Sequence, residues 1–347
     1  MQDNKRTEIA RLGEFGLIRH LTEKIELRNS SSILGVGDDA AVLSYTDKDK
    51  RVLVTTDLLL EGIHFDLVYV PLKHLGYKSA VVNFSDIYAM NGQPKQITVS
   101  LGISKRFSVE DLEDFYSGLA LACEEYGVDI VGGDTSASLT GLSISITCIG
   151  EGFEDKIVKR NGAKETDIIC VSGDLGAAYM GLQLLEREKA VFDGKADFAP
   201  DFSGKEYLLE RQLKPEARKD IIAALAAENI IPTSMIDISD GLSSELLHIC
   251  TQSKTGCRIY EERIPLDYQT ASMAEQFNLN VTTVALSGGE DYELLFTVPL
   301  HKHEIVSKMK GVHVIGHMTN QSLGLAIETR DGTEIELKAQ GWNSLDE

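Results

Sequence analysis

Six short acidic segments constrain this chain more than any other feature. Each places Asp or Glu beside Gly, Ser or Thr at the end of an apolar run: residues 37–40 (GDDA), 55–57 (TTD), 83–86 (NFSD), 132–135 (GGDT), 237–241 (DISDG) and 287–291 (SGGED). Solvated acids usually lie among Lys and Glu on helix faces, whereas small residues at strand ends let the backbone approach a ligand closely. The pattern therefore predicts ligand binding at several strand ends.

Strand and helix patterns alternate along the chain and predict a mixed α/β fold in two halves. Strands are expected at 51–56, 97–102, 142–149, 168–172, 293–298 and 312–316, and helices at 75–90, 109–122, 175–188 and after Pro215. Ser108 is expected to cap the second helix, with Asp111 three residues on. Gly and charged residues cluster at 150–164, which predicts domains 1–154 and 155–347. The polar segment 188–206 predicts a surface excursion.

The charge balance narrows the range of partners. The chain of 347 residues has 34 Lys and Arg against 54 Asp and Glu, a formal net charge of -20. Such a chain repels nucleic acid and anionic membranes, and we expect it to handle an anionic substrate through divalent cations. No apolar run approaches the ~20 residues of a membrane helix, and no signal-type segment begins the sequence. We therefore expect a cytoplasmic protein. Five scattered cysteines without a CxxC pair predict neither a zinc ribbon nor a disulfide framework.

The acidic segments suit a hard divalent cation. Carboxylate and hydroxyl oxygens without nearby His or Cys favour Mg²⁺ or Ca²⁺, and the spacing does not fit an EF-hand loop. Two carboxylates ~5 Å apart repel by about 3 kcal/mol at an effective dielectric near 20. Several cations would hold such a cluster together and would also bridge the phosphates of a nucleotide.

Five of the six acidic segments also have a purely structural explanation. Turns account for 37–40 and 132–135, and a helix N-cap accounts for Asp57. A satisfied buried hydrogen bond accounts for Asn83 and Asp86, which are three apart on one helix face. Capping accounts for one of Asp237 and Asp240. Six such segments in one chain favour the ligand hypothesis over six separate coincidences.

Three further side chains stand out, and the usual nucleotide motifs are missing. Arg160 suits bidentate phosphate contact, His64 follows the Asp57 strand closely, and Trp342 suits stacking on a flat ring. Their alternatives are a surface arginine, a loop histidine and a tail anchor. No GxxxxGK[ST] P-loop is present, and the GxGxxA-like run at 35–40 carries two carboxylates that would repel a pyrophosphate.

The six segments, in their order along the chain, resemble the motifs of the thiamine-monophosphate kinases. The resemblance includes two further segments, 13–15 (GEF) and 61–65 (EGIHF). The resemblance runs from about residue 13 to 343. It implies the two-domain α/β fold of the aminoimidazole-ribonucleotide-synthetase-like superfamily, with the N-terminal domains forming the interface of a homodimer. It further implies direct, in-line, Mg²⁺-dependent transfer of the ATP γ-phosphate to thiamine phosphate, giving thiamine diphosphate and ADP.

The resemblance also assigns roles to individual residues by matching motif. It implies Mg²⁺ ligands at Asp39, Thr55, Thr56, Asp57, Asp86, Asp134, Asp237 and Asp240. It implies ATP contacts at Gly133, Asp134, Arg160 and Ser239, and thiamine phosphate contacts at His64, Glu290 and Trp342. Asp57, Asp86, Asp134, Arg160 and Asp240 would form the catalytic set. Tyr116 matches a position near the nucleotide, on a weaker local resemblance.

Other functions remain open at this point. One is another ATP-dependent enzyme of the same superfamily. A second is a non-catalytic sensor of a nucleotide or a divalent metal, and a third is an acidic calcium-binding scaffold. Selenophosphate synthetases usually carry a reactive cysteine in an N-terminal Gly-rich segment, whereas the first cysteine here is Cys123. An acidic calcium-binding scaffold predicts metal binding without a nucleotide.

Overall fold

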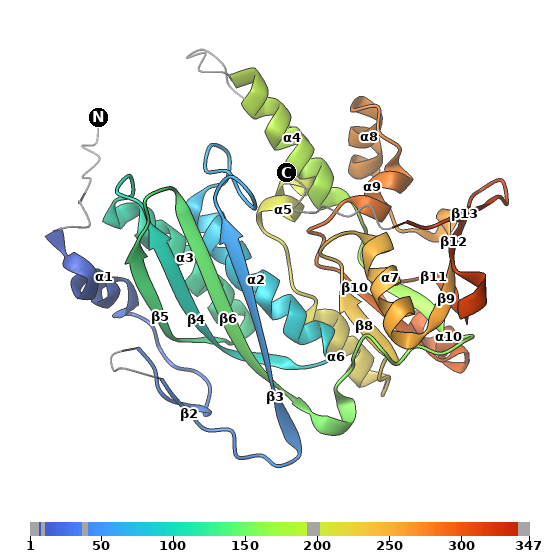
Figure 1. Cartoon of the computed structure of the whole chain (residues 1–347), viewed down its shortest axis with the longest axis horizontal. Coiled ribbons are helices and arrows are strands. Elements are labelled where there is room, and N and C mark those ends of the chain that lie inside the picture. Colours follow the sequence, from blue (N-terminus) through green and yellow to red (C-terminus); the bar gives the residue numbers. More distant parts are fainter. Residues whose placement is uncertain (1–6, 8–10, 37–40, 193–201, 339–347) are drawn as a thin grey trace. The chain divides into compact units, whose positions relative to one another are not determined.

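A computed structural model describes residues 7, 11–36, 41–192 and 202–338, and the chain divides into two compact units (Figure 1). The first unit comprises residues 1–87 and 92–155. The second unit comprises residues 88–91 and 156–347.

A four-stranded sheet forms the centre of the first unit. Its order is β3 (Lys50–Leu60), β6 (Leu142–Phe153), β4 (Gln93–Ile103) and β5 (Asp129–Ala137). β6 is antiparallel to both neighbours, and β5 is parallel to β4. Alternate residues of β6 from Leu142 to Cys148 are buried and the residues between them are half-buried. The strict alternation predicted for a half-buried strand is confirmed. A separate two-stranded sheet pairs β1 (Ser32–Leu34) with β2 (Val42–Leu43) in the same unit.

Helices α2 (Leu72–Ala89) and α3 (Val109–Tyr126) cover one face of this sheet (Figure 1). A Cβ atom on Gly76 would lie 1.9 Å from the carbonyl oxygen of Phe115, and one on Gly118 would lie 1.7 Å from that of Lys73. The two helices therefore approach this closely only because both positions are glycine. The first helix, α1 (Gly13–Thr22), precedes them in the chain.

The predicted cap of α3 is present as a capping box. Ser108 Oγ accepts a hydrogen bond from the Asp111 N–H at 3.3 Å, and the Asp111 carboxylate accepts one from the Ser108 N–H at 2.7 Å. Two N–H groups at the start of the helix are thereby satisfied.

The opposite face of β3 carries exposed apolar side chains. Val52, Val54 and Leu58 are exposed by 46%, 65% and 56%. They alternate along an edge strand and therefore share one face. Such a row of apolar side chains favours a protein partner.

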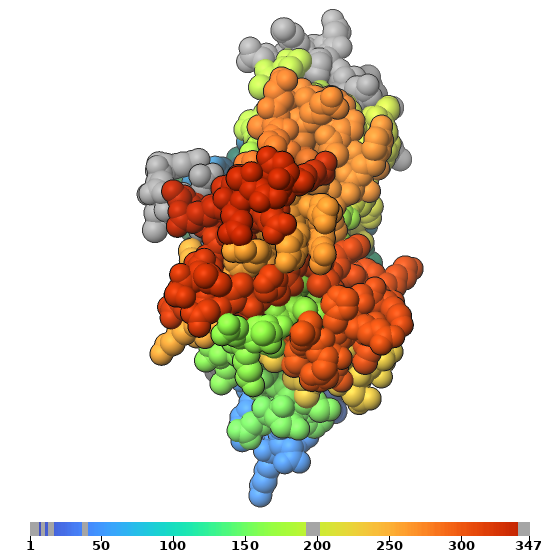
Figure 2. Space-filling view, turned by 90° about the vertical axis from the view of Figure 1, so that its right-hand side faces the viewer, coloured from blue at the N-terminus to red at the C-terminus, as the bar shows by residue number. Residues whose placement is uncertain are grey.

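A seven-stranded sheet forms the centre of the second unit. Its order is β13 (Glu334–Glu336), β12 (Leu325–Glu328), β9 (Thr255–Tyr260), β11 (Val312–Asn320), β7 (Ile168–Ser172), β10 (Leu294–Val298) and β8 (Ser234–Asp237). Among the neighbouring pairs of these seven described strands, only β12 and β9 are parallel. Every residue of β7 and β10 is buried, as expected for central strands covered on both faces. Figure 2 shows the red C-terminal part of this unit at its surface, and all three residues of β13 are exposed.

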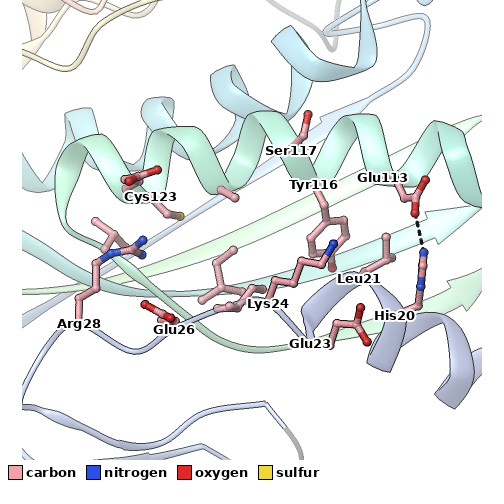
Figure 3. Close-up of a pocket in the computed structure, with 15 residues that line it drawn as sticks. His20, Leu21, Glu23, Lys24, Glu26, Arg28, Glu113, Tyr116, Ser117 and Cys123 are labelled. Carbon is pink, nitrogen blue, oxygen red and sulfur yellow. Dashed lines mark hydrogen bonds and ion pairs between the residues drawn. The ribbon is translucent and has the colours of Figure 1, made fainter.

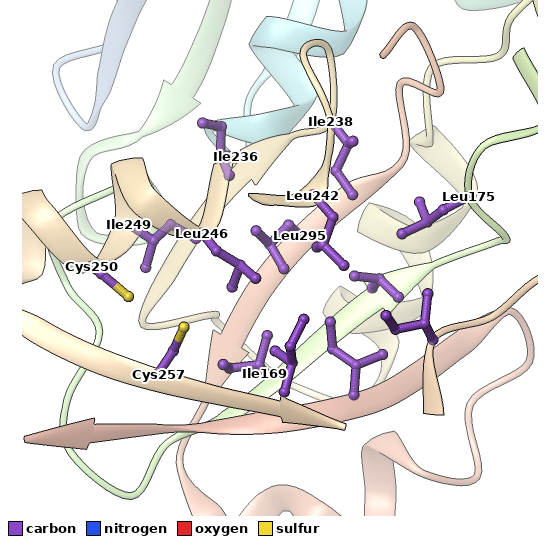
Figure 4. Close-up of a cluster of buried hydrophobic side chains, with 14 of the residues drawn as sticks. Ile169, Leu175, Ile236, Ile238, Leu242, Leu246, Ile249, Cys250, Cys257 and Leu295 are labelled. Carbon is purple, nitrogen blue, oxygen red and sulfur yellow. The ribbon is translucent and has the colours of Figure 1, made fainter. Parts of the chain in front are cut away.

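Helices lie on both faces of this sheet, so successive residues of β7 enter two different cores. Ile169 and Val171 pack with residues of α7 (Leu242–Ser253) and α9 (Val281–Ser287) (Figure 4). Ile168 and Cys170 pack with residues of α6 (Lys219–Ala227) and α10 (His303–Val306). A third apolar cluster joins α4 (Ala177–Phe192), α5 (Glu206–Leu213) and α8 (Tyr268–Gln276).

The predicted strands and helices are confirmed with small shifts of their ends. One boundary is wrong: the excursion predicted from residue 188 begins later, because α4 continues to Phe192. Lys189 lies 3.5 Å from Glu186, one helical turn back, so polar residues form a solvated helix face here rather than a loop. Residues 193–201 lie outside the described part. In the described ranges, no helix has both the length and the hydropathy needed to cross a bilayer.

Candidate active site

Two acids of the first unit lie close together between sheet and helix. Asp57 belongs to β3 and Asp86 to α2, and Thr55 Oγ1 donates a hydrogen bond to Asp86 Oδ2. Burial and, to a smaller extent, the nearby charge of Asp86 raise the pKa of Asp57 to about 6. A cation between the two carboxylates would remove this repulsion.

Asn83 adds an oxygen without a hydrogen-bond partner among the described residues. Its Nδ2 donates to the carbonyl oxygen of Ser79 at 3.1 Å, but its Oδ1 is buried and accepts no hydrogen bond from them. Asn83 lies on the same helix face as Asp86, one turn earlier. The structural explanation for Asn83 therefore accounts for its amide nitrogen and not for its oxygen. Carboxylate, hydroxyl and amide oxygens together form the donor set that Mg²⁺ prefers.

No three His, Cys, Asp or Glu side chains gather as a metal cluster within residues 7, 11–36, 41–192 and 202–338. Asp39, the further metal ligand expected from the sequence of this unit's first acidic segment, lies outside the described residues. The described part of this site is thus a pair of acids with neutral oxygens around it.

Thr56 lies on the other face of β3. Alternation along the strand separates it from Thr55 and Asp57. Its Oγ1 donates to the carbonyl oxygen of Ile146 and accepts from Thr147 Oγ1, each at 3.1 Å. Its expected role as a metal ligand stays a prediction.

Asp134 lies at the opposite edge of the sheet from Asp57. Three strand spacings separate β5 from β3, which is roughly 14 Å. The register sets Asp134 level with Ser100, which is level with Ser145 and then with Leu58. Asp134 therefore shares the open face with Leu58 and not the helix-covered face with Asp57. Within one chain, the sheet does not bring these two acids together.

The glycine beside Asp134 has a packing role. A Cβ atom on Gly133 would lie 1.9 Å from the carbonyl oxygen of Val99 on β4. Only glycine fits this close approach of two backbones. Its expected contact with ATP is a separate hypothesis that the packing does not test.

His64 is held in one tautomer by the turn after β3. Its Nδ1 accepts a hydrogen bond from the Leu60 N–H at 3.0 Å. The neutral ring therefore carries its proton on Nε2, which is a donor. Such a donor suits a phosphate oxygen.

A cavity of about 460 Å³ opens beside α3 (Figure 3). Residues of α1, the segment after it, α3 and β5 line it, among them Lys24, Arg28 and Tyr116. His20 and Glu113 join across one end at 2.6 Å. Neither Asp57 nor Asp86 lines this cavity, so the cavity and the acidic pair are separate features of the first unit. Tyr116 supplies it with an aromatic ring.

Two loops of the second unit pair through their backbones. Asp237 ends β8, Ser239 and Asp240 lie between β8 and α7, and Glu290 lies before β10. The Glu290 N–H donates to the Ser239 carbonyl oxygen at 2.7 Å, and the Tyr292 N–H donates to that of Ile238 at 2.9 Å. These bonds continue the pairing of β8 with β10 beyond the strand ends. The fold therefore brings Ser239 and Glu290 together.

Charges of both signs surround Asp240. Burial raises the pKa of Asp240, Glu290 raises it further, and the charges of His248 and Arg160 oppose the rise. Arg160, Asp240 and Glu290 thus share one electrostatic environment. The Arg160 carbonyl oxygen accepts a hydrogen bond from Ser253 Oγ at 3.1 Å, which holds this segment against the end of α7.

Glu245 is a residue of this site that the sequence interpretation missed. It is buried on α7, and one of its oxygens accepts a hydrogen bond from the Asp240 N–H at 3.0 Å. Its Oε2 has no hydrogen-bond partner in the part of the chain that the structure describes, and burial raises its pKa to about 8. The signal was an acid between Leu242 and Leu246 on an apolar helix face, where an unpaired charge is unfavourable.

Trp342 lies outside the described residues. The structure brings together Thr55, Asp57 and Asp86 in the first unit, and Arg160, Ser239, Asp240 and Glu290 in the second.

Comparisons with known proteins cover nearly the whole chain. Residues 37–151 match the family model of the AIR synthase related protein, N-terminal domain. A thiamine-monophosphate kinase of Aquifex aeolicus is 36% identical over 288 residues, which cover 83% of this chain and 86% of that protein. A thiamine-monophosphate kinase of Bacillus subtilis is 32% identical over 343 residues, which cover 96% and 99%.

Solved structures show the same likeness. The structure of AaThiL complexed with AMPPCP and TMP is 34% identical, with a TM-score of 0.73 over 96% of this chain and 97% of that chain. The hydrogenase maturation protein HypE in complex with ATP has a TM-score of 0.72 at 20% identity, over 93% of this chain and 94% of that chain. The second likeness concerns the fold alone.

Proposed function

This chain belongs to the thiamine-monophosphate kinase family, and we infer from this that it transfers the γ-phosphate of ATP to thiamine phosphate, giving thiamine diphosphate and ADP. One observation carries the inference. The chain matches, over 96% of its length, a kinase whose structure holds AMPPCP, an analogue of ATP, together with TMP.

We propose Mg²⁺ as the metal of the reaction. Thr55, Asp57 and Asp86 would hold it in the first unit, and the buried free oxygen of Asn83 supports this donor set. Asp39, Thr56, Asp134, Asp237 and Asp240 remain further proposed ligands on the family resemblance. Bound Mg²⁺ would supply positive charge that offsets the repulsion between the two phosphate groups.

The remaining groups of the site act on the acceptor. A phosphate monoester has a second pKa of ~6 and is already a nucleophile near neutral pH, so direct in-line transfer needs no strong general base. The Nε2–H of His64 would donate to a phosphate oxygen, and Arg160 would add a fixed positive charge. Glu290 and Trp342 would suit the flat, cationic thiazolium ring.

We propose that the nucleotide contacts Gly133, Asp134, Arg160 and Ser239. Tyr116 lines the cavity of the first unit, and a cavity of about 460 Å³ with one aromatic wall is suitable for a flat base. Lys24 and Arg28 in the same lining would pair with phosphates, although Glu23, Glu26, Glu113 and Glu124 also line the cavity. The cytoplasm contains ATP and is the compartment that we propose for the reaction.

We propose a homodimer formed by the first units, with the second unit completing the active site. The exposed row of Val52, Val54 and Leu58 supports this, since burying it would remove apolar area from water.

A phosphate-transfer assay tests the proposed function. Purified protein is given ATP, Mg²⁺ and thiamine phosphate, and thiamine diphosphate and ADP are measured, with free thiamine as the control acceptor. We expect one thiamine diphosphate per ADP, loss of the reaction with EDTA and no product from free thiamine. ADP without thiamine diphosphate would indicate another ATP-dependent enzyme of the superfamily. No ADP would favour a nucleotide or metal sensor.

A further inference from the structure

Residues 287–293, which we call the acidic loop, carry three acids that are each held by a group from elsewhere in the second unit. Glu290 Oε2 accepts a hydrogen bond from Gln212 Nε2 at 2.8 Å. Asp291 Oδ2 accepts one from the Gly176 N–H at 2.7 Å. Glu293 Oε1 accepts one from Arg211 Nη1 at 2.9 Å. Two of these three partners, Arg211 and Gln212, are neighbours on α5.

The backbone of the acidic loop needs such support. Glu290 has φ +64° and Tyr292 has φ +52°, in the left-handed region that residues other than glycine rarely occupy. Conformations of this kind persist where the surrounding structure holds them in place. The side-chain bonds from α5 and the backbone bonds to Ser239 and Ile238 provide that restraint.

Helix α5 is itself packed tightly against α4. A Cβ atom on Gly181 would lie 2.2 Å from the carbonyl oxygen of Leu208 and 2.9 Å from Gln212 Cβ. Gln212 is only 4% exposed. The amide that meets Glu290 therefore comes from a fixed part of the scaffold rather than from a surface side chain.

The two donors on α5, Arg211 and Gln212, differ in charge and bind different acids. Arg211 binds Glu293 and lies 3.7 Å from Asp291, and Arg218 binds Glu293 and Asp220. These acids therefore lie against guanidinium groups. The bond to Glu290 comes from a neutral amide, which orients a carboxylate without adding a positive charge to it.

We propose that Gln212 is a positioning residue for the acceptor site. It fixes the orientation of the Glu290 carboxylate and adds no positive charge of its own, so that the site favours a cationic acceptor such as the thiazolium of thiamine phosphate. The inference rests on the proposed function, which supplies thiamine phosphate as the ligand and Glu290 as its contact.

Calorimetric titration with thiamine phosphate tests this without turnover. Gln212→Met keeps the length of the side chain and removes the donor, and we expect it to weaken binding about tenfold, as for a hydrogen bond to a charged group. Glu290→Gln should weaken binding at least as much. Because Gln212 acts through Glu290, the double variant should bind no more weakly than Glu290→Gln alone.

Two further variants make the test specific. Gln212→Lys can still donate but neutralises Glu290, and we expect it also to weaken binding. Gln321→Met changes an exposed glutamine of the same unit and should bind as the unchanged protein does. Thermal unfolding shows whether each variant is folded, and Gln212→Asn, which has an amide with a shorter reach, replaces Gln212→Met if that variant unfolds.

Several results would overturn the proposal. Unchanged affinity in folded Gln212→Met is one, and additive losses in the double variant are another. Unchanged affinity in Gln212→Lys would overturn the charge argument. A protein that binds thiamine phosphate with the expected coupling but makes no thiamine diphosphate would refute the proposed function alone. A protein that makes thiamine diphosphate without the coupling would refute this inference alone, and one that does not bind thiamine phosphate would refute both.

Discussion

The acids of the first unit and those of the second unit are held in opposite ways. Asp57 lies beside Asp86, and each carboxylate increases the unfavourable charge around the other. Glu293 receives hydrogen bonds from Arg211, Arg218 and Ser172 and is almost fully buried. Burial and a like charge raise the pKa of Asp57, while Glu293 lies against two guanidinium groups.

This difference separates two roles that the same residue types can have. A carboxylate beside another carboxylate is stabilised when a cation binds, so it indicates a ligand site. A buried carboxylate between guanidinium groups is already compensated by the chain, so it indicates structural support. The predictions below test whether the two units follow this division.

The largest expected effect is on turnover in the first unit. Asp57→Ala should lower the rate of thiamine diphosphate formation by about a thousandfold, because charge neutralisation dominates phosphoryl transfer. The thermal unfolding temperature should not fall, since the change removes a like-charge repulsion. Glu154→Ala, at an exposed acid of the same unit, is the control and should remain active. Near-normal activity of Asp57→Ala at ordinary Mg²⁺ would refute the metal-site assignment.

The second effect is on stability in the second unit. Glu293→Gln should lower the free energy of unfolding by about 3–5 kcal/mol, because it leaves buried guanidinium groups without their charge partner. Glu304→Gln removes an exposed ion pair with Lys308 and should change the free energy of unfolding by less than about 0.5 kcal/mol. Urea unfolding measures both. Equal losses in the two variants would contradict the division between the units.

A smaller effect is expected on the pH dependence of the metal-free protein. The pKa of Asp57 is about 6 in the folded chain and ordinarily 3.8. The folded state thus binds more protons in this window, and the free energy of unfolding should fall as pH rises from about 4 to 6. Two pKa units set an upper limit of about 3 kcal/mol, reduced by solvent screening.

Asp57→Asn isolates this contribution from that of other groups, including Asp291, whose pKa burial raises to about 7. The free energy of unfolding of each protein is measured by urea unfolding with EDTA from pH 4 to 7. The difference between the two values should show the pH dependence that Asp57 contributes. Saturating Mg²⁺ should abolish it. A difference that grows in the opposite direction with pH would show that Asp57 is stabilised in its charged form.

The smallest effect concerns the hydroxyl beside the acidic pair. Thr55→Val removes the hydrogen bond to Asp86 at almost constant volume. We expect the Mg²⁺ concentration for half-maximal rate to rise about tenfold, as when a group that orients a ligand is lost. Thr147→Val, on the open face, is the matched control. An unchanged Mg²⁺ requirement would separate Thr55 from the metal.

Local patterns in the sequence predicted much of the fold. The alternation in residues 142–149 predicted β6, and Ser108 with Asp111 predicted the cap of α3, because both depend on neighbours in the chain. The end of α4 was missed, since a polar run can be a loop or a solvated helix face. Glu245 was missed because its partner is the backbone of another segment.

The sequence by itself determined the residue types of the candidate site, the strand ends that carry them and the family of the chain. Only the tertiary structure decided which acids meet. The order of strands in the first unit separates Asp57 from Asp134 by three strand spacings, and packing of α5 places Gln212 against Glu290 across 78 residues of sequence. These distances depend on sheet order and helix packing, which arise from contacts between distant segments and leave no local pattern in the chain.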